Sequence, residues 1–401
     1  MPVFSPFISL RYVDRTAADA LVAPPYDVLS EAQRTSLENR HPHNSVRMDF
    51  PHGKTDPQAY VGVAERVRAW LSSGVLAFDE VATFTVYRMT ASVDGRKTTT
   101  TGVLGALRLE APGTGDILPH EQTTPKDKAD RLSLLRAARL NTSPIWGLSL
   151  TAGLGRACAE VTASATPDLH ATDEGVLHEA WIVSDPTTCG RIQELVAQSP
   201  IVIADGHHRL ETALGYQGEC SAGDEGAASI LALIVELAPE ELEIRPIYRL
   251  VDAPTGVDIE EVLRPFFDLE RVELDNDDFV TGAVAGGALG LVTMSGRWFA
   301  RPRPDAFGEP VDLDTVALAT ALQSVDGVSA RYHHDAIVVF AAVAEGSASA
   351  GVFVRPVRID QIRTVAETRT RMPPKATFFW PKPRTGVVFR PLDVPLADSP
   401  V

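Results

Sequence analysis

One segment of the 401-residue chain, residues 201–213, joins a structural pattern to a run of chemically active side chains; it reads IVIADGHHRLETA. The apolar, β-branched residues at its start predict a short buried strand over Pro200–Ala204. A helical pattern follows to about Tyr216, so the chain turns from strand to helix at Asp205–Arg209. Such a turn gathers free backbone N–H groups at a helix N-terminus, which is a natural binding place for phosphate.

The polar residues of this turn have distinct chemical capacities. Asp205 can hold a metal ion or act as a base, and Gly206 permits a backbone geometry that a side chain would hinder. His207 and His208 can transfer protons, contact phosphate or ligate a metal. Arg209 can hold a phosphate through two N–H groups. Each residue also has a structural explanation, such as helix capping by Asp205, but their density favours a functional site.

The same segment raises the question of a metal ion. His207, His208 and Glu211 could ligate one, although they lack the HExxH order of zinc hydrolases. Mg²⁺ arriving with ATP or ADP fits better, because it needs only one or two carboxylates besides the phosphates. Asp205 and Glu211 are the expected metal ligands.

A second cluster, residues 120–131, reads HEQTTPKDKADR and opens a helix predicted over Pro125–Leu140. Glu121 is a candidate general base. Lys126 and Arg131 are candidate phosphate contacts. The alternative is a solvated helix start that carries ordinary ion pairs, and both interpretations stay open.

A third cluster, residues 371–386, reads RMPPKATFFWPKPRTG. Lys375 and Thr377 could close over a phosphate, with an aromatic side chain against a base or a sugar. A C-terminal segment pinned to the core by its aromatic residues is the favoured alternative, and a proline-rich ligand for another protein is a third. Near the N-terminus, Tyr26 and Asp27 could also reach a site, although a structural turn is the simpler explanation of Pro24–Asp27.

Composition narrows the class of protein. The 37 Lys and Arg residues against 53 Asp and Glu give a net charge of −16, which argues against non-specific nucleic-acid binding. The longest apolar runs, such as Ile230–Val235, are far shorter than a membrane span, and the N-terminus lacks the pattern of a secretory signal. Cys158, Cys189 and Cys220 are widely spaced, so we expect three free thiols in a reducing cytoplasm.

The predicted elements mix hairpins and helices, which indicates an α+β (mixed α/β) fold of several domains with mixed sheets. Ser30 and Gln33 form a capping-box pattern, a helix is predicted over Pro57–Ser72, and Asp94-Gly95 predicts a hairpin. A strand is predicted over Ala336–Ala342. We expect an N-terminal α+β region (1–145), a central region with the turn (146–255) and a C-terminal α+β region (256–401).

These segments together resemble a prokaryotic family catalogued as domain of unknown function 1015. The resemblance covers Pro24–Val28, His120–Leu132 with Asn141–Ile145, Ala204–Leu214 and Met372–Val387, nearly end to end and in the same order. Leu210 stands where an aromatic residue is common, and Ala376 where Ser is common. Tyr248-Arg249 stands where His-Arg is expected, which puts a role for that position in doubt.

The Asp205–Arg209 turn is also similar to the nucleotide-binding loop of ParB/sulfiredoxin-type proteins, especially their free-serine kinases. This second resemblance implies a ParB/sulfiredoxin-like nucleotide-binding core around the turn. It implies phosphate and metal handling by Asp205, Gly206, His207, His208 and Arg209. Genes of the first family commonly lie beside serine-biosynthesis genes, which implies an amino-acid or phospho-amino-acid substrate.

The resulting hypothesis is a nucleotide-dependent small-molecule phosphotransferase, with free L-serine as one candidate substrate. One alternative is a phosphatase of phosphoserine or a related phosphoester, and another is a non-enzymatic nucleotide-binding sensor or interaction protein. The expected partners are a nucleotide and a small-molecule substrate, without nucleic acid or membrane. A homodimer stays open, as does the question of which of His207 and His208 faces the ligand.

Overall fold

The chain forms two units in this computed structural model. The structure describes residues 1–53, 57–93, 95–111, 113, 115–119, 128–221, 223–307 and 312–393. The first unit comprises 1–119, 123–243 and 381–401, and the second comprises 120–122 and 244–380. The first unit therefore contains segments from both ends of the chain. The three-region division expected from the sequence stays a prediction.

The first unit is built on a mixed sheet. Strand β11 (Ile201–Asp205) runs parallel to β6 (Ile117–Pro119), and β12 (Ser229–Glu236) runs parallel to β8 (Ile145–Ser149). The other described pairings are antiparallel. The central strand β12 is buried over all but its last residue, which explains its unbroken apolar sequence. In spatial order the strands are β6 (Ile117–Pro119), β11 (Ile201–Asp205), β8 (Ile145–Ser149), β12 (Ser229–Glu236), β5 (Arg96–Arg108), β4 (Phe84–Val93), β10 (Val176–Val183) and β9 (Leu169–Asp173), with β1 (Phe4–Ser5) also paired to β5.

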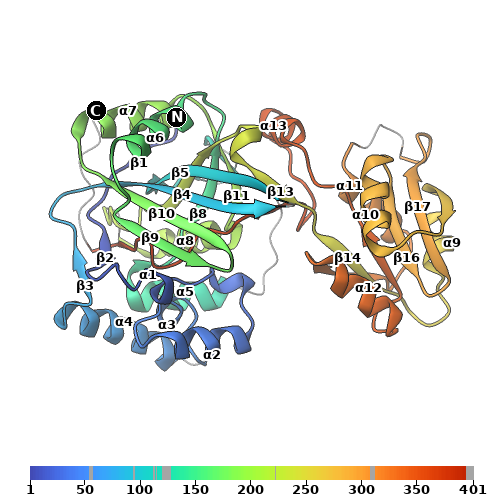
Figure 1. The fold of residues 1–401 in the computed structure, drawn as a ribbon, viewed down its shortest axis with the longest axis horizontal. Helices are drawn as coiled ribbons and strands as arrows, with labels where there is room; N and C mark the ends of the chain where they lie inside the picture. Colours follow the sequence, from blue (N-terminus) through green and yellow to red (C-terminus); the bar gives the residue numbers. More distant parts are fainter. Residues whose placement is uncertain are drawn as a thin grey trace. The chain divides into compact units, whose positions relative to one another are not determined.

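Helices lie on both sides of these strands (Figure 1). On one side are α6 (Leu154–Ser164) and α7 (Pro186–Ala197). The other side carries α1 (Ala18–Leu21), α2 (Glu31–Arg40), α3 (Val46–Asp49), α4 (Pro57–Ser72) and α5 (Lys128–Ala138). Helix α8 (His207–Glu219) packs against α5, β8 and β12. This packing holds the start of α8 between the sheet and the N-terminal helices.

Several local predictions are confirmed, and with them the mixed α+β class. Ser30 and Gln33 form the capping box of α2, α4 has the predicted bounds, and β4 pairs with β5 in register from Thr85 to Val93. The strand-to-helix turn is present between β11 and α8. All three cysteines are free. Within the described residues, no helix combines the length and the apolar character needed to cross a bilayer.

The second unit has its own antiparallel sheet with helices on both faces. Successive residues of a strand point to opposite faces of the sheet. In β14 (Tyr248–Asp252), Leu250 therefore joins an apolar cluster with α10 (Asn276–Ala285) and α12 (Ala336–Ala344). Val251 joins another cluster, with α9 (Ile259–Leu263) and α11 (Asp314–Leu322). The strand order is β15 (Phe267–Val272), β17 (Gly296–Pro302), β16 (Leu289–Thr293), β19 (Ala350–Phe353), β14 (Tyr248–Asp252) and β18 (Ser329–His333). The helices are α9 (Ile259–Leu263), α10 (Asn276–Ala285), α11 (Asp314–Leu322), α12 (Ala336–Ala344) and α13 (Ile359–Thr368).

The strand predicted over Ala336–Ala342 is wrong, because these residues form helix α12. Asp335 caps the helix, and its carboxylate accepts a hydrogen bond of 2.8 Å from the Ile337 N–H. The buried residues Val339, Phe340, Ala342 and Val343 follow helical spacing. A short continuous apolar run does not distinguish a buried strand from a buried helix by periodicity alone, and the capping Asp was the available signal.

The last part of the described chain returns to the first unit as a buried segment, Pro381–Leu392, which we call the C-terminal segment. Each of its residues is buried. Leu10 bridges Phe389 and Ala23 bridges Thr385, and β21 (Arg390–Pro391) pairs with β7 (Leu140–Asn141). These contacts bring residues from the end of the sequence beside the turn after β11.

Candidate functional site

The turn between β11 and α8 is shaped by Gly206, whose backbone is left-handed with φ 86°. Its carbonyl accepts the first hydrogen bond of the helix, from the Leu210 N–H at 2.9 Å. As the N-cap residue, Gly206 has no side chain with which to cap α8. The N–H groups of the first helical turn normally need partners from outside the helix, so this end suits an anion.

Asp205 does not cap the helix but holds two cations. Its Oδ1 accepts a hydrogen bond from the Lys382 ammonium group, and its Oδ2 lies 2.8 Å from Arg209 Nη2. Burial alone would raise the pKa of Asp205, but the charges of Lys382 and Arg209 outweigh it and hold that pKa well below its usual value. The carboxylate therefore stays ionised and is a weak proton acceptor in this arrangement.

Arg209 connects the turn to two other parts of the first unit. It is 8% exposed and donates a hydrogen bond to the carbonyl of Pro144. Its Nη2 also lies 3.6 Å from a carboxylate oxygen of Asp27. Burial opposes the charged form, while Asp27 and Asp205 raise the pKa of Arg209 above its usual value. Arg209 thus provides a permanent, firmly held positive charge.

The two histidines of the turn differ in burial. His207 is 8% exposed, and it lies near enough to Asp205 to act with Lys382 and Arg209 on the pKa of that carboxyl group. His208 is only partly buried, and its carbonyl accepts a 2.8 Å hydrogen bond from Thr212 Oγ1. Glu211 is also partly buried. His207 is therefore the histidine held closer to the charged cluster.

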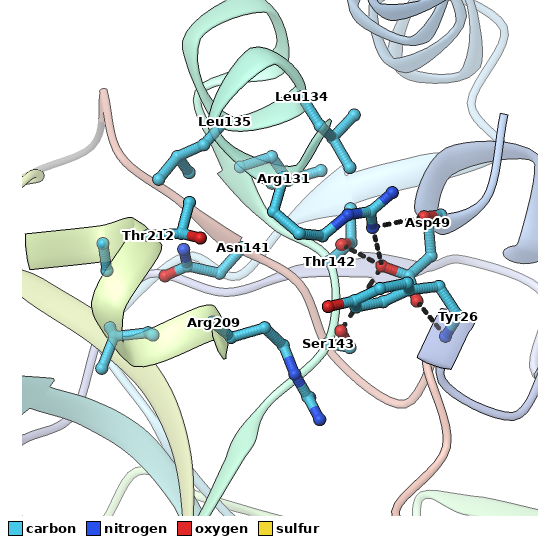
Figure 2. A pocket seen from close by; sticks show the side chains of 13 residues that line it. Tyr26, Asp49, Arg131, Leu134, Leu135, Asn141, Thr142, Ser143, Arg209 and Thr212 are labelled. Carbon is cyan, nitrogen blue, oxygen red and sulfur yellow. Dashed lines mark hydrogen bonds and ion pairs between the residues drawn. The ribbon is translucent and has the colours of Figure 1, made fainter. Parts of the chain in front are cut away.

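Arg131, a predicted phosphate contact, lies instead against Asp49 and Tyr26. Its Nη1 donates a 2.6 Å hydrogen bond to the Asp49 carbonyl, and its guanidinium carbon lies 3.8 Å from the centre of the Tyr26 ring. Figure 2 shows Arg131 reaching this cluster from α5, while Arg209 comes from α8. Burial opposes the charged form, but Asp49 and Asp130 raise the pKa of Arg131.

Asp49 organises this cluster by accepting several hydrogen bonds. Its Oδ1 accepts one of 2.6 Å from Thr142 Oγ1, and its Oδ2 accepts one of 3.1 Å from the Tyr26 N–H. Thr385 of the C-terminal segment adds a 3.2 Å hydrogen bond to Oδ2. Because both of its oxygens accept hydrogen bonds, Asp49 orders the backbone and side chains around it.

A small pocket lies between Arg131 and Arg209. Its polar wall includes Tyr26, Asn141 and Thr142, and Leu134, Leu135 and Ile230 form an apolar wall (Figure 2). The cavity measures about 40 Å³, space for roughly three water molecules. In this conformation it suits a single small polar group more than a whole nucleotide.

The sequence interpretation did not select several residues that the structure brings together here. Lys382 and Thr385 lie inside the third sequence cluster, residues 371–386. A lysine follows a proline twice in this cluster, at Lys375 and at Lys382, so the pattern that made Lys375 a candidate phosphate contact applied equally to Lys382. Asp27 was named but explained as part of a turn. Asp49 stands alone in the sequence, and no pattern marked it.

The remaining predicted residues belong to the second unit or lie outside the described residues. Lys375 and Thr377 belong to the second unit; Lys375 is exposed, and its carbonyl accepts a 3.0 Å hydrogen bond from Arg249. Glu121 and Lys126 lie outside the described residues, so their roles stay predictions.

No group of three His, Cys, Asp or Glu side chains arranged to hold a metal ion occurs among the described residues. Both oxygens of Asp205 already face cations, so a Mg²⁺ ion bound directly to Asp205 would have to displace one of them. Asp27, at 36% side-chain exposure, is the carboxylate beside Arg209 with more room for a cation.

The comparisons with known proteins show the family. The model of the family described as "Protein of unknown function (DUF1015)" matches residues 4–324. No curated protein matches the chain.

Solved structures give distant likenesses. A conserved hypothetical protein from Pyrococcus furiosus has 12% identity and a TM-score of 0.37, covering 66% of this chain and 87% of that one. Free serine kinase in complex with AMP has 12% identity and a TM-score of 0.38, covering 66% and 83%. SbnI with a C-terminal truncation, from Staphylococcus aureus, has 12% identity and a TM-score of 0.40, covering 70% and 85%. Likenesses this distant assign no ligand or reaction to the chain.

Proposed function

The chain belongs to the DUF1015 family of proteins of unknown function, and we propose that it is a nucleotide-dependent phosphotransferase that acts on a small hydroxyl-bearing molecule. L-serine is the first substrate to test, since the resemblance of the Asp205–Arg209 turn to free-serine kinases pointed to it. The observation that carries the proposal is the N-terminus of α8, formed at a left-handed glycine beside buried Arg209.

The turn offers three features that a transferring phosphate needs. The N-terminus of α8 supplies N–H donors and the positive end of the helix dipole. Arg209 and Lys382 supply positive charge, and Asp205 fixes both cations in place. Phosphoryl transfer depends mainly on positioning and on neutralising charge, and this turn is organised for both.

In the proposed reaction the substrate hydroxyl oxygen attacks the terminal phosphorus of the nucleotide. A new P–O bond forms to the substrate, the P–O bond to the shortened nucleotide breaks, and the hydroxyl proton passes to a carboxylate. Glu121 stays the predicted base. Asp27 is a second candidate, because it is the more exposed carboxylate beside Arg209 and its recorded ion pair with Arg209 is long, at 3.6 Å.

Mg²⁺ would arrive with the nucleotide phosphates and neutralise part of their charge. Asp205 and Glu211 are the residues proposed from the sequence to contact it. Because Asp205 holds Lys382 and Arg209, its contribution is better placed in positioning these cations.

An end-point assay by phosphorus NMR tests the proposal. The protein is incubated with Mg²⁺, L-serine and either ATP or ADP, and separately with O-phosphoserine alone. We expect a phosphoserine signal that falls at least tenfold in Lys382→Gln and His207→Ala. Lys97→Gln, which removes an exposed cation from β5, is the matched control and should behave as the wild type.

Other outcomes separate the alternatives. Free phosphate from O-phosphoserine alone would identify a phosphatase. Nucleotide binding without turnover of any hydroxyl substrate would support the sensor. If neither nucleotide nor phosphate stabilises the protein, and Asp205→Asn behaves as the wild type, the phosphate site itself is refuted.

A further inference from the structure

The second unit contains a cavity of about 590 Å³ that the proposed phosphotransferase does not use. One wall is helix α11, and another is formed by Ala330 and Tyr332 of strand β18. Residues 371–374, the start of the third sequence cluster, line it as well. Cavities of 300–1,000 Å³ are the usual size for sites that bind small organic molecules.

The charged part of this cavity is cationic. Arg249 and Arg371 line it, and its described lining residues include no Asp or Glu. Arg249 is 5% exposed, its guanidinium carbon lies 4.8 Å from the centre of the Tyr332 ring, and its Nη2 donates a 3.0 Å hydrogen bond to the Lys375 carbonyl. These contacts fix the Arg249 side chain, so little side-chain entropy is lost when the acidic group of a ligand binds to it.

Two local features explain why these groups meet. Arg249 and Tyr332 are register partners on β14 and β18, so their side chains share one face of the sheet. Arg249 and Val251 lie on the same face by alternation, and Val251 packs in the cluster that contains Leu318 of α11. The strand pairing therefore places the guanidinium beside α11.

Apart from Thr315, Gln323 and Tyr332, the rest of the lining is apolar. Val316 and Leu322 come from α11 or its end, and Met372, Pro373 and Pro374 come from the returning chain. Two successive prolines fix their backbone angles, so they provide a rigid wall. A ligand that fills this space needs an acidic group at the arginines and an apolar body against Leu322 and Met372.

We propose that this cavity is a binding site for a small organic anion, a carboxylate or a phosphate with an apolar body. The proposal is independent of the phosphotransferase, because every residue it uses belongs to the second unit. It gives the Arg371–Pro374 part of the third cluster a role different from closing over the phosphate of a nucleotide.

Methionine methyl groups provide a direct test, because the chain has five methionines and Met372 lines the cavity. The full-length protein is labelled at its methionine methyls, and the Met372 signal is assigned with Met372→Leu. Three probes share one apolar body: 1-naphthoate, 1-naphthyl phosphate and the neutral 1-naphthalenemethanol. We expect each anion to shift the Met372 signal saturably, while the signal of exposed Met294 stays in place.

The charge requirement is tested with matched variants. Arg371→Gln should weaken binding of the anions about tenfold, the effect of losing one charged hydrogen bond, and should leave the neutral probe unchanged. Arg363→Gln removes a cation from α13 that does not line the cavity, and it should bind as the wild type. Ala319→Trp, which fills the cavity, should abolish the Met372 shift.

The two anionic probes also show which acidic group the arginines prefer. Tighter binding of 1-naphthoate indicates a carboxylate ligand, and tighter binding of 1-naphthyl phosphate indicates a phosphate ligand. The proposal is overturned if no probe shifts Met372, if 1-naphthalenemethanol binds as tightly as both anions, or if Arg371→Gln binds them as the wild type does. An unchanged methyl spectrum of free Arg371→Gln shows that this variant is folded.

Discussion

Gly206 is the residue on which the geometry of the turn depends most directly. A Cβ atom at this position would lie 2.9 Å from Ile145 Cγ2 and 3.2 Å from Arg209 Cζ, in a backbone conformation with φ 86°. We therefore expect Gly206→Ala to lower the free energy of unfolding by about 1–3 kcal/mol, measured by urea denaturation. Gly215→Ala in the same helix meets nothing within 4 Å and should raise it by about 0.5–1 kcal/mol; equal effects would contradict the assigned geometry.

His178 makes the stability of the first unit depend on pH. Its side chain is fully buried, and its Nδ1 lies 2.7 Å from the Tyr87 hydroxyl. Burial, and to a lesser degree Arg384, lowers the pKa of His178 to about 3. Because the unfolded chain takes up this proton near pH 6.5 and the folded one does not, stability falls as the pH falls below 6.5.

Between pH 7.5 and pH 5 this difference corresponds to about 2 kcal/mol. We expect the wild type to lose that stability in urea denaturation over this range, and His178→Gln to lose about 2 kcal/mol less. His170→Gln changes an exposed histidine on the neighbouring strand β9 and should keep the wild-type pH dependence. Parallel curves for the wild type and His178→Gln would refute the assignment.

Residues joined locally could be predicted, and those joined across the fold could not. The turn at Asp205–Arg209 was visible because five polar residues stand within Asp205–Glu211, at the end of one strand. Lys382 contacts Asp205 although 177 positions separate them in the sequence, and Asp49 collects partners from Tyr26 to Thr385. Such pairs depend on the tertiary path of the chain, and nothing in the local pattern around Asp49 specifies them.

At the scale of elements, length and amphipathic periodicity were sufficient where a cap or a turn marked the ends. Helix α4 and the β4–β5 hairpin are of this kind. Helix α12 was mistaken for a strand because its apolar residues are continuous. The chain from Glu243 to Asp252 forms two strands, with β13 (Glu243–Arg245) ending just before Pro246 and β14 beginning at Tyr248, since proline cannot donate a ladder hydrogen bond.

The C-terminal segment is held by Arg390, which is fully buried. Its guanidinium donates hydrogen bonds to Asn141 Oδ1 at 3.0 Å, the Ser229 carbonyl at 2.9 Å and the Gly226 carbonyl at 2.9 Å. Burial lowers the pKa of Arg390 to about 10, so it is charged at neutral pH. Removing it takes one hydrogen bond from each of these three acceptors, of which Asn141 Oδ1 keeps the one from the Leu231 N–H.

We expect Arg390→Met to lower the free energy of unfolding by about 3–5 kcal/mol. Arg390→Lys should recover only part of this loss, because one ammonium group cannot match the planar geometry of the guanidinium. Arg96→Met, at an exposed position of β5, should stay within about 0.5 kcal/mol of the wild type. A small effect of Arg390→Met in urea denaturation would show that the segment is held by its apolar contacts instead.

At the scale of the whole molecule, the second unit is inserted into the first. The chain leaves the first unit after Glu243 and returns at Pro381, and β13 pairs with β20 (Phe378–Trp380) where the insertion begins and ends. Each unit has apolar clusters of its own. A pattern read along the chain does not by itself show that segments far apart in the sequence share one core.

This connectivity predicts that a large internal deletion is tolerated better than a small terminal one. Replacing residues 246–377 with a short Gly-Ser linker should leave the first unit folded, since its core clusters and the C-terminal segment are retained. Ending the chain at Trp380 removes fewer residues but takes away a segment that is buried throughout, so the first unit should lose cooperative unfolding and dispersed NMR signals. The separate segment 244–380 should fold alone. The prediction is refuted if the chain stays folded without residues 381–401, or if the first unit unfolds when only residues 246–377 are replaced.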